Sequence, residues 1–188
     1  AYMSVCIAGQ MGVQGKALQD LAVCALLHDN ALTQYIQEEL HNDIAHATAT
    51  REFPQLGTHC SSGEKNIQGL PFHTDVANVI LYHHENADGS GPFGKKWTEI
   101  PLFARIIHMC DLLDVSCRAK IFTTETWEKA NRFLQKADGS MIDGECIDAF
   151  FHAFSEPDFL SLGDENLETF LWNKIPRIKQ ELDFAQIK

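Results

Sequence analysis

The stretch that decides the fold runs from residue 74 to residue 94 and reads TDVANVILYHHENADGSGPFG. Its first half predicts a helix with one buried face, because apolar residues recur three and four positions apart. The residues of that face are Val76, Val79, Ile80 and His83. The helix would end on two adjacent histidines, His83 and His84, directly before a glycine-rich turn. Neighbouring helical side chains point about 100° apart, so the pair suggests two separate binding positions rather than one shared cavity.

The remainder of the chain is also predicted to be helical. We expect helices over residues 16–29, 30–43, 99–118, 124–137, 143–154 and 164–183, from the spacing of apolar residues and from Gly and Pro at the boundaries. Residues 47–63, rich in Thr, Ser, Gly and Pro, are expected to form a loop. No useful run of period-two alternation is present, so the predicted fold class is an all-α helical bundle.

Composition narrows the class of protein. The 188 residues, 45% of them hydrophobic, predict a single domain over residues 1–188 with a real core. The net charge of -11 argues against a large nucleic acid as partner, and no uninterrupted apolar span predicts membrane insertion. The six cysteines form no C-x-x-C pair, and Cys24 and Cys110 lie in apolar runs, which indicates free thiols and a cytoplasmic location. Helical spacing already present at Tyr2 suggests that the chain is a piece of a longer protein.

Several ionisable residues interrupt otherwise apolar helices. Each one alone would most often be a hydrogen-bonded core residue, because an unpaired buried charge is costly. Together they supply four imidazoles and two carboxylates from separate segments, a ligand set that suits Fe, Mn, Zn or Ni. The candidate metal ligands are His28, Asp29, His59, His83, His84 and Asp111. Adjacent histidines fit two metals about 3.5–4 Å apart, an arrangement that activates water for attack on phosphorus.

The order of these residues resembles the HD superfamily of metal-dependent phosphohydrolases, with LLHD at 26–29 as its signature pair. Three further stretches resemble the HD-GYP branch: HCSSG at 59–63, HHENADGSGPFG at 83–94 and EIPLFARIIHMCDLLDV at 99–115. The resemblance covers residues 15–155 and implies an HD-domain helical bundle. It also implies two or three divalent metal ions, iron or manganese, with His28 and Asp29 as catalytic residues. The implied activity is hydrolysis of cyclic di-GMP in bacterial signalling.

The chain departs from the family pattern where the substrate would bind. Asn30, Ala31 and Leu32 stand where the family has a small residue, Gly and the phosphate-holding Lys, and Gly91-Pro92 lacks the intervening Tyr. We therefore expect a wider and less base-specific entrance formed by the turn DGSGPFG. The expected substrate contacts are Gly91, Pro92, Arg105, Arg118 and Lys120. A further ligand on the family's first helix is expected before Ala1.

Three functions remain open at this point. The first is a cyclic dinucleotide phosphodiesterase, and the second is an HD-type hydrolase acting on another nucleotide or phosphate ester. The third is a catalytically weak, metal-bound signalling or binding module. The first two take a small-molecule partner, and in the third the metal site senses a ligand or is merely structural. A homodimer or a fused sensory domain is compatible with each. The many N and O ligands favour catalysis, since structural metal sites use closed four-ligand sets.

Overall fold

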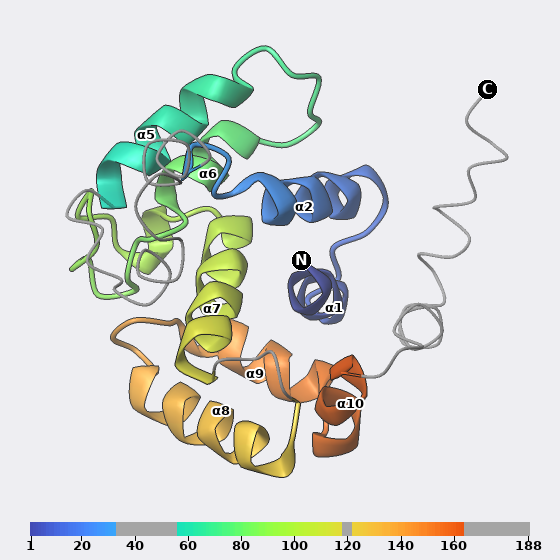
Figure 1. Ribbon diagram of the computed structural model, residues 1–188. Coiled ribbons are helices and arrows are strands. Elements are labelled where there is room, and N and C mark those ends of the chain that lie inside the picture. The colour runs from blue at the N-terminus through green and yellow to red at the C-terminus, as the bar shows by residue number, and fades with distance from the viewer. Residues whose placement is uncertain (33–55, 118–121, 164–188) are drawn as a thin grey trace, which may run out of the picture.

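The computed structural model describes residues 1–32, 56–117 and 122–163, and within these ranges it contains eight α-helices and no strand (Figure 1). The α-helices are α1 (Tyr2–Gln10), α2 (Gly15–Leu27), α5 (Leu56–Ile67), α6 (Val76–Tyr82), α7 (Leu102–Cys117), α8 (Thr124–Ala137), α9 (Gly144–Ala153) and α10 (Glu156–Leu160). Two short 3-10 helices, η1 (Trp97–Glu99) and η2 (Ser161–Gly163), complete the set. The predicted all-α fold class is confirmed.

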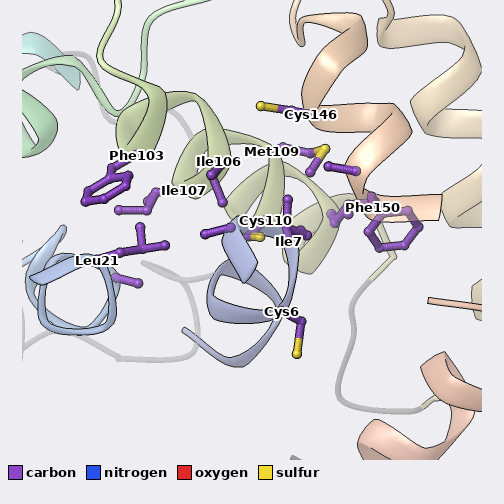
Figure 2. Close-up of a cluster of buried hydrophobic side chains, with 14 of the residues drawn as sticks. Cys6, Ile7, Leu21, Phe103, Ile106, Ile107, Met109, Cys110, Cys146 and Phe150 are labelled. Carbon is purple, nitrogen blue, oxygen red and sulfur yellow. The ribbon is translucent and has the colours of Figure 1, made fainter. Parts of the chain in front are cut away.

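Helix α7 runs through the middle of the bundle (Figure 1). Helices α1, α2 and α6 pack on one part of α7, and α8 and α9 pack on another. Figure 2 shows apolar side chains of α1, α2, α7 and α9 meeting in one core, where Ile7, Leu21 and Ile106 are fully buried. Burial of these side chains removes apolar surface from water, which is the main favourable contribution to folding.

Polar side chains fix where several helices begin. Asp75 accepts a hydrogen bond from the Asn78 backbone N–H at the start of α6. Thr123 caps α8, and Asp143 caps α9 by accepting from the Cys146 backbone N–H. These side-chain oxygens satisfy backbone donors that have no partner inside the first helical turn.

The predicted helices agree with the structure where it describes them. Helix α8 covers the predicted range 124–137, and α2, α6 and α9 lie within one or two residues of the predictions. Helix α7 begins three residues after its predicted start at residue 99. Only residues 30–32 of the predicted 30–43 helix are described, and the predicted 164–183 helix lies outside the described residues. The predicted burial of Cys24 and Cys110 is confirmed. Among the described residues, no helical segment combines the length and the hydrophobicity that crossing a bilayer requires.

The prediction of a loop over residues 47–63 is wrong from residue 56 onward, because Leu56–Ile67 forms α5. Gly, Ser and Thr favour helices weakly, but tertiary packing can override this preference. A Cβ atom at Gly63 would lie 3.1 Å from Ile80 Cγ2, so the glycine permits close packing of α5 on α6. The correction matters because it places His59 on a rigid helix.

Candidate metal centre

His28 and Asp29 follow directly after the last residue of α2. The Nδ1–H of His28 donates to the Ala25 carbonyl at 3.0 Å, which leaves Nε2 as the atom that faces Asp29 Oδ2, at 3.3 Å. Burial alone would lower the pKa of His28, but the hydrogen bond and charge of Asp29, with a contribution from the charge of Asp111, raise it. Asp111, half-buried on α7, therefore acts electrostatically on the same site.

His59 on α5 and His83 at the end of α6 face the other oxygen of Asp29. Their Nε2 atoms lie 3.4 Å and 3.5 Å from Asp29 Oδ1, and 3.4 Å from each other. The Nδ1–H of His83 donates to the Ile80 carbonyl at 2.6 Å, so its Nε2 is free to act as a ligand. Backbone hydrogen bonds of this kind fix the tautomer and orientation of metal-binding histidines.

These three atoms form a nearly equilateral triangle with edges of 3.4, 3.4 and 3.5 Å. The point equidistant from the corners lies about 2.0 Å from each, which is close to the metal–nitrogen and metal–oxygen bond lengths of about 2.0–2.2 Å. The triangle is therefore the right size for three ligands of one divalent ion. Asp29 Oδ1 is buried, and the Nε2 atoms of His59 and His83 face it, as expected of groups arranged to bind a cation.

The charge state of the carboxylate fits this arrangement. Burial alone would raise the pKa of Asp29, but hydrogen bonds from His28, His59 and His83 hold that pKa far below its ordinary value. The side chain is 38% exposed, whereas His59 and His83 are 3% and 0% exposed. Asp29 is thus an anion that lies between buried imidazoles and solvent.

The adjacent histidines do not diverge as helical neighbours would. His83 ends α6 and the chain turns after it, so the rings of His83 and His84 lie 4.1 Å apart between centroids. The His84 ring also lies 5.0 Å from that of His59. Burial, followed by the neighbouring imidazoles, lowers the pKa of His84 to about 2, which keeps it neutral and able to bind a metal.

Two residues near this cluster were missed from the sequence. Cys60 is fully buried, and its Sγ lies 3.7 Å from His59 Nε2. His108 on α7 is 4% exposed, its Nε2 lies 3.1 Å from Asn86 Oδ1, and burial lowers its pKa to about 4. Their only sequence signals were the positions beside His59 and inside an apolar helix, which are also common for ordinary core residues.

The glycine-rich turn is packed against the same residues. The buried Glu85 carboxylate accepts hydrogen bonds from the backbone N–H groups of Phe93 and Lys95. A Cβ atom at Gly91 would lie 2.6 Å from Glu85 Cα, so only glycine fits. Pro92 lies beside Gly57, two residues before His59 on α5. The turn is therefore held next to the histidine cluster.

Arg105, one of the expected substrate contacts, is paired with acidic side chains in the structure. Its Nη1 lies 3.2 Å from Asp143 Oδ2 and 3.5 Å from Glu145 Oε2, and its guanidinium stands over the Trp97 ring at 5.7 Å. The side chain is only 14% exposed. Through these ion pairs, Arg105 connects α7 to the start of α9. The other two expected basic contacts, Arg118 and Lys120, lie outside the described residues.

Known proteins share this sequence pattern and this fold. The family model described as HD domain matches residues 2–146. The cyclic di-GMP phosphodiesterase response regulator RpfG of Xanthomonas campestris is 28% identical over 158 residues, which cover 79% of this chain and 40% of RpfG. A cyclic di-GMP phosphodiesterase of Thermotoga maritima is 26% identical over 153 residues, covering 79% of this chain and 41% of that protein.

A solved structure gives the same picture of the fold. The crystal structure of a cyclic GMP-AMP specific phosphodiesterase from Vibrio cholerae matches with a TM-score of 0.68 and 22% identity, covering 92% of this chain and 47% of that one. The chain thus spans less than half the length of these proteins. The chain therefore belongs to the HD domain family, in the HD-GYP branch predicted from its motifs.

Proposed function

We propose that the chain is a metal-dependent phosphodiesterase that hydrolyses a cyclic dinucleotide, cyclic di-GMP first among them, in bacterial signalling. The observation that carries this proposal is the position of the Asp29 carboxylate. One oxygen faces His28, and the other faces His59 and His83. A carboxylate placed in this way can join two divalent ions, whereas each imidazole can bind only one.

The donor set fits such ions. His59, His83 and one oxygen of Asp29 would hold the first, and His28 with the other oxygen of Asp29, helped by the charge of Asp111, would hold the second. His84 adds a neutral imidazole to the same cluster. When bound, the ions would supply a nucleophile at neutral pH and neutralise charge on the phosphate. Iron and manganese are the metals that the family resemblance implies.

The residues of the chain determine how the substrate meets this cluster. Asp29 is more exposed than His28, His59 or His83, so the phosphodiester would approach from its side while His59 and His83 stay shielded. The turn held by Glu85 and Gly91 would form one wall of the entrance, with the half-exposed Phe93 ring against Tyr82 at 5.7 Å. An exposed aromatic ring in this position can stack on a nucleobase.

A second substrate class has a specific observation in its favour. Leu32 occupies the position where the family has a phosphate-holding lysine, and the turn lacks the family's tyrosine. The loss of these contacts predicts weaker selection among nucleotides, so other cyclic or linear dinucleotides belong in the test. The proposed partner is in each case a small nucleotide in a reducing compartment, which agrees with five buried free thiols among the described residues.

The experiment is a substrate panel with purified protein loaded with Fe²⁺ or Mn²⁺. Cyclic di-GMP, cyclic GMP-AMP and linear dinucleotides are incubated and the products separated by chromatography. We expect metal-dependent opening of a cyclic dinucleotide that Asp29→Asn abolishes and that Glu145→Gln, an exposed carboxylate elsewhere, leaves unchanged. Binding of cyclic dinucleotide without turnover by fully metal-loaded protein would instead support the signalling module.

A further inference from the structure

One described cysteine differs from the others in its surroundings. Four of the five buried thiols pack inside the main hydrophobic core, as expected for small apolar side chains. They are Cys6, Cys24, Cys110 and Cys146. Cys60 is equally buried but lies outside that core, beside the imidazoles of the candidate metal centre. Simple packing explains the four, but it does not explain why a sulfur lies among nitrogen donors.

The distance from the Cys60 sulfur to the nearest imidazole nitrogen matches the spacing of two ligands of one metal ion. Sγ of Cys60 lies 3.7 Å from His59 Nε2, the same nitrogen that faces Asp29 and His83. In a tetrahedral site with a metal–sulfur bond of about 2.3 Å and metal–nitrogen bonds of about 2.0–2.1 Å, the sulfur–nitrogen edge is roughly 3.6 Å. The observed separation therefore needs almost no movement of this pair to admit an ion.

The wider group is also compact. Donor atoms of Cys60, His59, His83 and His84 all lie within 4.8 Å of one another. All four are buried or nearly so, which removes competing water. The longest of these separations exceeds a tetrahedral edge by about 1 Å, a contraction within reach of side-chain rotation. The sulfur contact with His83 involves Nδ1, at 3.8 Å, the nitrogen already bonded to the Ile80 carbonyl, so His59 is the partner that matters.

We propose that Cys60 is a sulfur ligand of the ion held by His59, and that it biases this position toward thiophilic divalent ions such as Zn²⁺ over Mn²⁺. The inference rests on the metal centre of the proposed function. Thiolate is a soft donor that selects zinc, whereas carboxylate and water suit manganese. A cation within bonding distance of a thiol removes its proton, so the sulfur would bind as thiolate.

Cobalt provides the test, because Co²⁺ binds in zinc-type sites and its absorption spectrum depends on which ligand atoms surround it. The purified 188-residue chain is stripped of metal, loaded with Co²⁺ alone, and compared with Cys60→Ser and Cys60→Ala. Cys146→Ser is the matched control, since that thiol is also fully buried but lies in the hydrophobic core. We expect a near-ultraviolet sulfur-to-cobalt charge-transfer band in the unaltered protein and in Cys146→Ser. Both Cys60 variants should lose that band and keep the visible cobalt bands of a nitrogen and oxygen site.

The outcomes separate the two proposals. Visible cobalt bands without charge transfer in the unaltered protein would overturn sulfur ligation and leave the metal centre intact, whatever the variants do. Failure of the unaltered protein to bind Co²⁺ at all would overturn the metal centre, and the sulfur ligand with it. Competition between equal Zn²⁺ and Mn²⁺ gives a second readout: Cys60→Ser should lower the bound Zn-to-Mn ratio roughly tenfold or more. An unchanged ratio would contradict the proposed metal preference.

Discussion

The Nε2 atoms of His59 and His83 face each other at 3.4 Å in a buried setting. His83 commits its Nδ1–H to the Ile80 carbonyl, so its Nε2 offers a lone pair. Without a cation, His59 Nε2 would have to carry the proton and donate to that lone pair across 3.4 Å, a long distance for such a bond. A cation between the two rings lets both Nε2 atoms act as ligands, with the proton of His59 on Nδ1.

Asp29 should be the position on which bound metal depends most. Its two oxygens face different imidazoles, so Asp29→Ala removes a ligand from both proposed ions, whereas His84→Ala removes one from a single ion. We expect Asp29→Ala to retain clearly less metal than His84→Ala when both are analysed by elemental mass spectrometry. Equal metal content in the two variants would show that the carboxylate does not bridge.

The two ion pairs of Arg105 predict that replacing Asp143 and replacing Glu145 lower the unfolding free energy by different amounts. Asp143 is 7% exposed and also caps α9, so Asp143→Ala removes the cap and leaves the buried Arg105 charge with only the exposed Glu145 beside it. We expect a loss of about 3–5 kcal/mol of unfolding free energy. Glu145 is 65% exposed, and Glu145→Ala should cost less than about 1 kcal/mol. Denaturant unfolding of both variants measures the difference. Similar losses would mean that the Arg105–Asp143 pair does not join the helices.

The turn after His84 predicts a steric effect at Gly91. A methyl group there would lie within 2.8 Å of the Glu85 Cα, the Glu85 Oε1 and the Asn86 backbone nitrogen. We expect Gly91→Ala to lower the unfolding free energy by about 1–3 kcal/mol and to reduce hydrolysis. Gly9→Ala is the control, because that helical position has open space, and it should stabilise by up to about 1 kcal/mol. Equal stability of the two variants would refute the tight packing.

The buried His108 predicts sensitivity to acid. Burial lowers its pKa from 6.5 to about 4, so the unfolded chain binds the proton more readily over this window. Stability must therefore fall as the pH drops from 6.5 to 4, by about 3 kcal/mol from this residue alone. His108→Gln keeps a donor toward Asn86 Oδ1 but cannot titrate, so its unfolding free energy should depend less steeply on pH. An unchanged slope in a pH series of denaturant unfolding would rule out this contribution.

The helical fold could be predicted because its apolar spacing is local. Residues such as Val76, Val79 and Ile80 recur at the helical period, and Asp75 and Asp143 mark helix starts. Helix α5 could not be predicted from such signals. Its Gly, Ser and Thr residues favour turns, and packing against α6, through Gly63 and Ile80, stabilises it as a helix.

The same limit applies to the candidate site. Residue type and order predicted a cluster, and His28, Asp29, His59, His83 and His84 do lie together. The ion pair of Arg105 with Asp143 could not be predicted, since Asp143 lies 38 positions away and on another helix. The position of Cys60 in the cluster could not be predicted either, because the contact of its sulfur with His59 depends on side-chain geometry that the sequence does not specify.

Anomalous diffraction from crystals of the metal-loaded protein tests the central claim most directly, because it locates each ion independently of activity. The account predicts one peak about 2.0–2.2 Å from Asp29 Oδ1, His59 Nε2 and His83 Nε2, and a second on the side of Asp29 Oδ2 and His28, about 3.5–4 Å from the first. Two peaks bridged by Asp29 would establish the two-metal centre. A fully loaded crystal with a single peak, or with ions bound away from Asp29, would contradict it.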